Sequence, residues 1–362
     1  MADEGVADRM PTAIRYLQIG LLEEGMTPVL VIPDSERCYE LSAGPTSVVA
    51  YHPEGWLRFG RDASAVDSIL AQLAALKIDT PPLVHCLNVD GIRLAGQLAS
   101  RTDGQLIANL WSAEEGATMH VRRGDDGPRV ILAPSENIAK ELRGALPADC
   151  KVVVASLGVS QEQPSAKTPR PDQKPALVYS GPLSQHSGLH VALRAVRQVV
   201  RTHPWLMFFV IGKGPAESEL RAAAESLGIA ENVVFTGRVE YLRSVLSDCH
   251  VFCIPDWEGG YREELLQALS AGMAIVTVAG GPYDGLVDED SVLSYPAGDE
   301  DALALRLGRL LSEADLCRRL GRSAFALAKR AHTVTKMVDG YAAIYRDLHN
   351  RHRTLPIQRA DA

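Results

Sequence analysis

Short apolar runs alternate with amphipathic stretches along most of the chain. Runs of four or five apolar residues, as at 29–32, 208–211 and 250–254, are typical of strands buried on both faces. Between the runs, apolar residues recur at helical spacing, for example over 64–76 and 191–200. Strands that alternate with such helices predict an α/β protein whose parallel sheets are covered on both sides.

One polar stretch interrupts this alternation near the middle of the chain. Pro, Gln, Lys and Ser dominate residues 160–175, and no apolar pattern persists there. We therefore predict an N-terminal Rossmann-like domain over 1–159, a linker over 160–175 and a second Rossmann-like domain over 176–336. A final amphipathic helix and a basic tail fill 337–362.

The first domain begins unusually. A doubly wound domain normally starts with a strand that leads into its first glycine loop, but this chain begins at the loop, near Gly5. We expect the first strand to lie upstream of Met1, or a neighbouring segment to take its place. The alternative is a variant domain with one strand fewer.

Composition excludes several classes of protein. A length of 362 residues favours two domains, and a net charge of −8 argues against broad nucleic-acid binding. The six cysteines show neither metal-binding nor redox spacing. Neither a membrane-spanning run nor a signal peptide is present, so we expect a cytoplasmic protein.

The stretch 255–283 carries the strongest functional signal. It reads as a glycine loop, a helix, a strand and a second glycine loop, each loop following a strand. Glycines let backbone N–H groups approach a ligand, and a helix N-terminus favours an anion such as a diphosphate. Glu258 and Gln267 could bind sugar or ribose hydroxyls beside it. The alternative is an ordinary βαβ unit with a solvated acidic loop.

Glycine loops also follow the other strands of the second half, at 181–188, 212–214 and 237. In this order they resemble the donor half of GT-B glycosyltransferases of the retaining family 4 type. The similarity is best along VIGKGPAESELRAAAESLGIAENVVFTGRV (210–239) and PDWEGGYREELLQALSAGMAIVTVAGG (255–281). It implies two Rossmann-like domains facing each other across a cleft, with the final helix crossing back onto the first domain.

The resemblance also implies a reaction. A nucleotide-diphosphate sugar would bind in the cleft, with its base near 236–238, and its sugar would pass with retention to a glycan or lipid-linked acceptor. No metal or other cofactor is expected, because a helix N-terminus and basic side chains offset the leaving diphosphate. A lipid-linked acceptor would bring the protein to the inner face of the membrane as a peripheral protein.

Specific residues follow from the resemblance. Glu258 and His85 are the catalytic candidates, with His85 and Asp90 on the acceptor side. The donor-binding candidates are Gly181, His186, Lys213, Gly237, Arg238, Gly259, Gly260, Gln267, Gly280 and Gly281.

The sequence departs from the family pattern at the donor site. The family usually has Arg and Lys in its first donor loop, where this chain has Pro182 and Ser187. Its two glutamates are separated by seven residues, whereas here eight residues separate Glu258 from Gln267. Losing charge-assisted phosphate contacts could cost about 1.5–3 kcal/mol each. The alternatives are therefore a degenerate GT-B protein that binds a ligand or partner and, third, a nucleotide-sugar epimerase.

Overall fold

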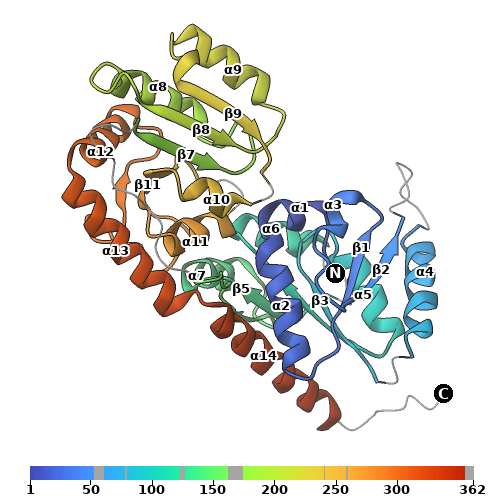
Figure 1. Cartoon of the computed structure of the whole chain (residues 1–362). Coiled ribbons are helices and arrows are strands. Elements are labelled where there is room, and N and C mark those ends of the chain that lie inside the picture. Colours follow the sequence, from blue (N-terminus) through green and yellow to red (C-terminus); the bar gives the residue numbers. More distant parts are fainter. Residues whose placement is uncertain are drawn as a thin grey trace, which may run out of the picture. The chain divides into compact units, whose positions relative to one another are not determined.

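The computed structural model describes residues 1–52, 61–77, 80–122, 127–161, 174–239, 241–257 and 260–354 (Figure 1). The chain folds into two compact units. Unit 1 comprises Met1–Gly158 and Val334–Ala362, and unit 2 comprises Val159–Thr333. Most of the predicted linker, 162–173, lies outside the described residues.

Unit 1 is built from parallel strands and helices. Its helices are α1 (Glu4–Arg9), α2 (Pro11–Glu23), α3 (Glu36–Tyr39), α4 (Arg61–Ala75), α5 (Ile92–Arg101), α6 (Ala113–Arg122), α7 (Glu136–Ala145) and α14 (Val334–Thr354). Its strands are β1 (Val29–Pro33), β2 (Ser47–Tyr51), β3 (Leu83–Cys86), β4 (Gln105–Asn109), β5 (Val130–Ala133) and β6 (Lys151–Val154). Within the described ranges these strands form a two-stranded sheet, β1-β2, and a separate four-stranded sheet, β3-β4-β5-β6.

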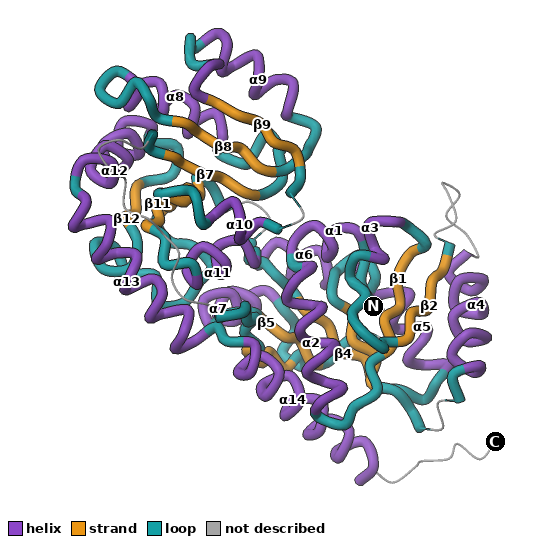
Figure 2. The backbone as a smooth tube through the Cα atoms, viewed as in Figure 1, coloured by secondary structure: helices purple, strands orange, loops and turns teal. Residues whose placement is uncertain are grey.

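Unit 2 contains a single parallel sheet among its described residues (Figure 2), with strand order β12-β11-β10-β7-β8-β9. The strands are β7 (Ala176–Ser180), β8 (Met207–Ile211), β9 (Val233–Gly237), β10 (Val251–Ile254), β11 (Ala274–Val278) and β12 (Leu293–Tyr295). The helices are α8 (Leu189–Val200), α9 (Glu217–Ser226), the 3₁₀ turn η1 (Ala230–Asn232), α10 (Leu242–Leu246), α11 (Glu263–Ser270), α12 (Glu300–Ser312) and α13 (Ala314–Ala331). The predicted α/β class with parallel sheets is confirmed.

Local sequence signals set several helix boundaries. The Ser135 hydroxyl accepts a hydrogen bond from the Ile138 N–H, which caps α7. Asp299 caps α12 in the same way. Pro11 stands at the start of α2, where its missing N–H costs nothing. Further along α2, the absence of a side chain at Gly20 lets Val338 of α14 pack closely, since a Cβ there would lie 2.2 Å from Val338 Cγ2.

The short elements α1 and β2 are among those that were not predicted from the sequence. The six-residue α1 lies in an opening segment that reads as polar, and it depends on its Asp3 cap and on burial of Val6 and Ala7. Strand β2 has only one fully buried residue, Val49, so its apolar signal is weak. Both depend on tertiary interactions that periodicity does not reveal.

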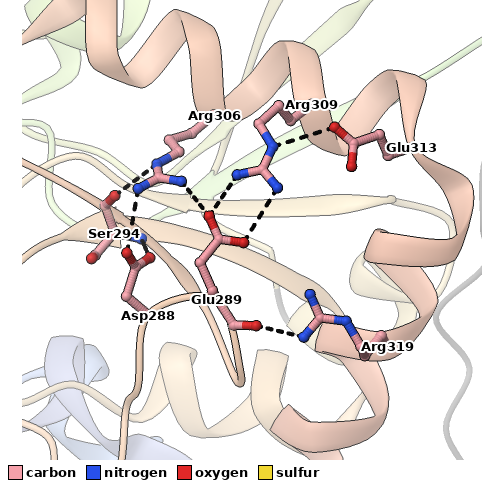
Figure 3. Close-up of polar contacts among 7 residues, drawn as sticks. All are labelled: Asp288, Glu289, Ser294, Arg306, Arg309, Glu313 and Arg319. Atoms are coloured by element: carbon pink, nitrogen blue, oxygen red, sulfur yellow. Dashed lines mark hydrogen bonds and ion pairs between the residues drawn. The ribbon is translucent and has the colours of Figure 1, made fainter.

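A carboxylate shared by two arginines ties the end of unit 2 together (Figure 3). Glu289 Oε1 accepts from Arg306 Nη1 at 2.6 Å and from Arg309 Nη1 at 2.5 Å, both on α12. Arg319 of α13 donates to the Glu289 carbonyl. Hydrogen bonding by Arg309 is the main reason that the pKa of Glu289 is lowered. Because these charges satisfy one another, the cluster has a structural role.

Candidate functional site

The glycine loops of unit 2 gather at the carboxyl edge of its sheet. Strand order reverses beside β7, which has β8 on one side and β10 on the other. In open parallel sheets the loops at such a switch point bind ligands. Here they are the loop 181–188 after β7 and the loop that begins at Pro255 after β10. Both belong to the predicted donor site.

Gly212 is required by the close approach of two of these loops to each other. A Cβ at Gly212 would lie 1.9 Å from the carbonyl oxygen of Gly181, and its φ of +138° disfavours any side chain. The Gly181 N–H donates to the Ile211 carbonyl, and the Gly212 N–H donates to the Gly237 carbonyl. The loops after β7, β8 and β9 are therefore locked together before any ligand binds.

Arg262, which immediately precedes α11, places a cation under the first loop. Its Nη1 lies 2.6 Å from the position of a Cβ on Gly181, and Tyr179 Oη lies 2.8 Å from the same position. Burial by itself lowers the pKa of Arg262, but Tyr179, Glu264 and Tyr283 outweigh it and raise the pKa above its usual value. The guanidinium is therefore a fixed positive charge at the switch point.

Aromatic residues hold the backbone of Arg262 in place. The Tyr283 hydroxyl donates to the Arg262 carbonyl and accepts from the Arg262 N–H, both at 2.6 Å. Tyr283 also stacks on Tyr261 at 4.2 Å between ring centroids. The hollow beside Arg262 has a cavity volume of about 10 Å³, which is room for one water molecule. A diphosphate could therefore meet this charge only at the rim of the hollow.

Other predicted donor residues lie on neighbouring loops of the same edge. Lys213 is exposed, and its Cε lies 3.6 Å from the position of a Cβ on Gly237, so the two are brought together. Arg238 follows Gly237 and is also exposed, as is His186 in the first loop. Lys213 and Arg238 thus place exposed cations after β8 and β9.

The remaining donor candidates differ in their exposure. Gly280 is exposed, with nothing within 4 Å of a Cβ position, whereas a Cβ on Gly281 would meet the indole of Trp257. Gly260 is buried, and its N–H donates to the Trp257 carbonyl. Gln267 is buried on α11, where its Nε2 donates to Glu263 Oε1 at 3.0 Å. Glu258 and Gly259 lie outside the described residues.

His85 lies in unit 1, with both ring nitrogens already engaged. One nitrogen, Nε2, is 2.7 Å from Asn109 Oδ1, and the other, Nδ1, is 2.6 Å from the Tyr345 hydroxyl. Burial is the main cause that lowers the pKa of His85 to about 3, so the ring is neutral at physiological pH. This geometry holds the imidazole in unit 1 and leaves neither nitrogen ready to accept a proton from a substrate. The catalytic role of His85 stays a prediction.

Sequence reasoning missed Arg262 and the tyrosines around it. The available signal was a basic residue two positions after the glycine pair 259–260 and just before a predicted helix. Within the part of the chain that the structure describes, no group of three or more His, Cys, Asp or Glu side chains could hold a metal ion. No helix in those ranges is long and apolar enough to cross a membrane.

Comparison with known proteins supports the interpretation of unit 2. Residues 160–326 match the sequence model of the family Glycosyl transferases group 1. The putative colanic acid biosynthesis glycosyltransferase WcaL of Escherichia coli is 29% identical over 170 residues, which is 43% of this chain and 41% of WcaL. The putative glycosyltransferase EpsD of Bacillus subtilis is 26% identical over 183 residues, covering 49% and 48%. The chain thus aligns with about half of the length of these curated relatives.

Solved structures resemble this chain over most of its length. A glycosyltransferase from Rickettsia africae is 12% identical, with a TM-score of 0.74 over 96% of this chain and 97% of its own. Anabaena Alr3699/HepE, solved in complex with UDP and glucose, is 14% identical, with a TM-score of 0.75 over 93% and 96%. The predicted GT-B fold is confirmed by these likenesses. Residues 160–326 thus match the model of the glycosyl transferases group 1 family, in a chain with the fold of GT-B glycosyltransferases.

Proposed function

We propose that this protein is a glycosyltransferase that moves a sugar from a nucleotide-diphosphate sugar, with retention, to a glycan or lipid-linked acceptor. The observation that carries the proposal is the fixed cation of Arg262 beneath a glycine loop at the switch point of unit 2. The names of the relatives, which refer to colanic acid and other cell-surface polysaccharides, support the acceptor class. A lipid-linked acceptor would place the reaction at a membrane surface.

The donor half follows from charge and loop position. Negative charge grows on the diphosphate as it leaves the sugar, and a preorganised cation stabilises that charge best where water is scarce. Arg262 would supply it in place of the basic pair that Pro182 and Ser187 replace. Exposed Lys213 would bind the outer phosphate, and 236–238 would face the base. Glu258 would contact the transferred sugar.

No metal is part of this proposal. The cations at the loops could offset the diphosphate, as a helix N-terminus also does. The neutral and fully bonded ring of His85 supports a positioning role in unit 1 over proton transfer.

A second function, ligand or partner binding without transfer, has one specific observation in its favour. The first donor loop carries no cation of its own, because Pro182 is exposed and Ser187 is buried with its hydroxyl donating to the Ser184 carbonyl at 2.8 Å. In this alternative Arg262 would serve only to hold the loops together.

Calorimetric titration of UDP, GDP and ADP distinguishes the two functions. We expect micromolar binding of one nucleotide, and Arg262→Met should weaken it about 10- to 100-fold, as expected for loss of a charge-assisted contact of about 1.5–3 kcal/mol. Arg262→Lys should recover part of the affinity. Arg197→Met, at an exposed position on α8, is the matched control and should bind normally.

Transfer itself needs a second assay. The nucleotide that binds best identifies the sugar donors to test, and release of its diphosphate with a saccharide acceptor measures turnover. Retention would be read from the anomeric proton of the product by NMR. If a folded sample binds none of the three nucleotides at millimolar concentration, the transfer proposal is wrong and partner binding becomes the better account.

A further inference from the structure

The carbonyl groups at the start of the first donor loop, 181–188, point into the protein. The Gly181 carbonyl faces Gly212, where a Cβ would lie 1.9 Å from its oxygen. The Leu183 carbonyl accepts from the Ala216 N–H at 3.0 Å. Carbonyl oxygens carry partial negative charge and would repel a diphosphate. Because these carbonyls turn inward, a loop that has no cation of its own can still face an anion.

The carbonyl between these two is held by a side chain, that of Tyr179. Tyr179 lies in β7, two residues before the loop, and only 2% of it is exposed. Its hydroxyl donates to the Pro182 carbonyl at 2.8 Å. The carbonyls on either side lie against backbone atoms. Pro182 is therefore the position at which this part of the loop depends on a side chain.

The same hydroxyl is bonded to the guanidinium of Arg262. Arg262 Nη1 and Tyr179 Oη lie 2.6 and 2.8 Å from one point, the position of a Cβ on Gly181, and a side-chain hydrogen bond joins the two residues. A guanidinium can only donate, so the Tyr179 oxygen accepts from Arg262 and its own hydrogen goes to the Pro182 carbonyl. The hydroxyl therefore links the cation to the loop in one chain of hydrogen bonds.

This chain keeps the guanidinium in one place. A hydroxyl that accepts from a cation is polarised, which strengthens the hydrogen bond that it donates. The Arg262 backbone is fixed as well, because Tyr283 bonds its N–H and its carbonyl, both at 2.6 Å. Without the Tyr179 hydroxyl, the Pro182 carbonyl would lose its donor, and the guanidinium would be drawn to that acceptor and away from an anion.

We propose that Tyr179 is a positioning residue for the diphosphate of the donor. Its hydroxyl holds the guanidinium of Arg262 at the switch point and supplies the Pro182 carbonyl with a donor, so that the cation stays available to the ligand. The inference rests on the proposed function, in which Arg262 stabilises the leaving diphosphate. A buried tyrosine thus serves anion recognition in a loop that carries Pro182 and Ser187 at the positions of the basic pair.

The test compares the wild type with Tyr179→Phe, which removes only the hydroxyl. Calorimetric titration measures the affinity for whichever of UDP, GDP and ADP binds best, and competition measures the affinity for the matching nucleoside. We expect Tyr179→Phe to weaken binding of the diphosphate about tenfold and to leave the nucleoside unchanged, because in the proposed function the base faces 236–238 and only the phosphates meet Arg262. Tyr341→Phe, which removes a buried hydroxyl from unit 1, is the matched control and should bind both ligands as the wild type does.

A double-variant cycle distinguishes positioning from a general loss of structure. In the Arg262→Met background, Tyr179→Phe should weaken diphosphate binding by less than about twofold, since the hydroxyl acts through the guanidinium. Hydrogen exchange in β8 and β10 should match the wild type in Tyr179→Phe, whereas faster exchange throughout both strands would count against a positioning role.

The outcomes separate this inference from the proposed function. If the wild type binds a nucleotide and Tyr179→Phe binds it equally well, only the positioning role is wrong. Equal losses for the diphosphate and the nucleoside, or a full tenfold loss in the Arg262→Met background, would also overturn it. If the wild type binds no nucleotide, the proposed function and this inference are both wrong.

Discussion

Acidification should destabilise unit 1 through one residue, His85. In the folded state its Nε2 lies against Asn109 Oδ1, and the Asn109 amide nitrogen donates to the Leu132 carbonyl at 3.4 Å. The Asn109 oxygen therefore faces the ring, so Nε2 carries the hydrogen and Nδ1 accepts from the Tyr345 hydroxyl. Protonating Nδ1 would remove that acceptor and leave a buried charge between a hydroxyl and an amide.

The magnitude follows from linkage. Burial lowers the pKa of His85 from 6.5 to about 3, so below pH 6.5 the unfolded chain binds a proton that the folded chain does not. The proton uptake by the unfolded chain therefore costs no stability well above pH 6.5, and the free energy of unfolding falls as the pH drops from 6.5 toward 3. Each pH unit in this window costs about 1.4 kcal/mol, so a change from pH 6.5 to 5 should cost about 2 kcal/mol of the free energy of unfolding.

The assay compares the wild type with His85→Gln, because Gln keeps a donor and an acceptor but does not titrate. Urea unfolding is followed at pH 7, 6 and 5 by hydrogen exchange of peptides from β3 and β4, which isolates unit 1. The other histidines and the Met1 amine contribute equally to the pH dependence of both proteins, so their contributions drop out of the difference. We expect the wild type to lose about 2 kcal/mol more than the variant between pH 7 and 5. Equal losses would refute the reasoning, since they would show that His85 titrates normally.

Three further predictions concern unit 2. Glu289→Gln should lower the free energy of unfolding, measured in urea melts, by about 1 kcal/mol or less, since its ion pairs are partly exposed. The loss should shrink in 1 M salt, and Glu313→Gln is the control with the smaller expected loss. Gly212→Ala should destabilise by about 2–5 kcal/mol because its Cβ meets backbone and its φ is +138°. Gly280→Ala, with a φ of +76° and open space around its Cβ, should cost about 1–2 kcal/mol in thermal melts, and equal costs would contradict the clash. Tyr283→Phe should lower the free energy of unfolding by about 1–3 kcal/mol and weaken nucleotide binding, since the Arg262 backbone loses both hydrogen bonds to the hydroxyl. An unchanged nucleotide affinity in calorimetric titration would contradict a positioning role for Tyr283.

Hydrophobic periodicity was enough to predict the fold of unit 2. Runs such as 208–211 and 251–254 are apolar throughout because strands of a parallel sheet are covered on both faces, and this local pattern is visible without tertiary information. It was less informative where elements are short or half-buried, as in α1 and β2.

For the candidate site, too, one part could be predicted from the sequence and another part depended on the tertiary structure. The sequence by itself determined that glycine loops follow successive strands, and because parallel strands end at one edge, it also determined that those loops meet. It could not determine which charges face the loops. Only the tertiary structure decided that Arg262 lies under Gly181, that Gln267 is buried against Glu263 and that both nitrogens of His85 are engaged. Those outcomes depend on side-chain directions and on partners distant in sequence, such as Tyr345 for His85, and no local pattern encodes them.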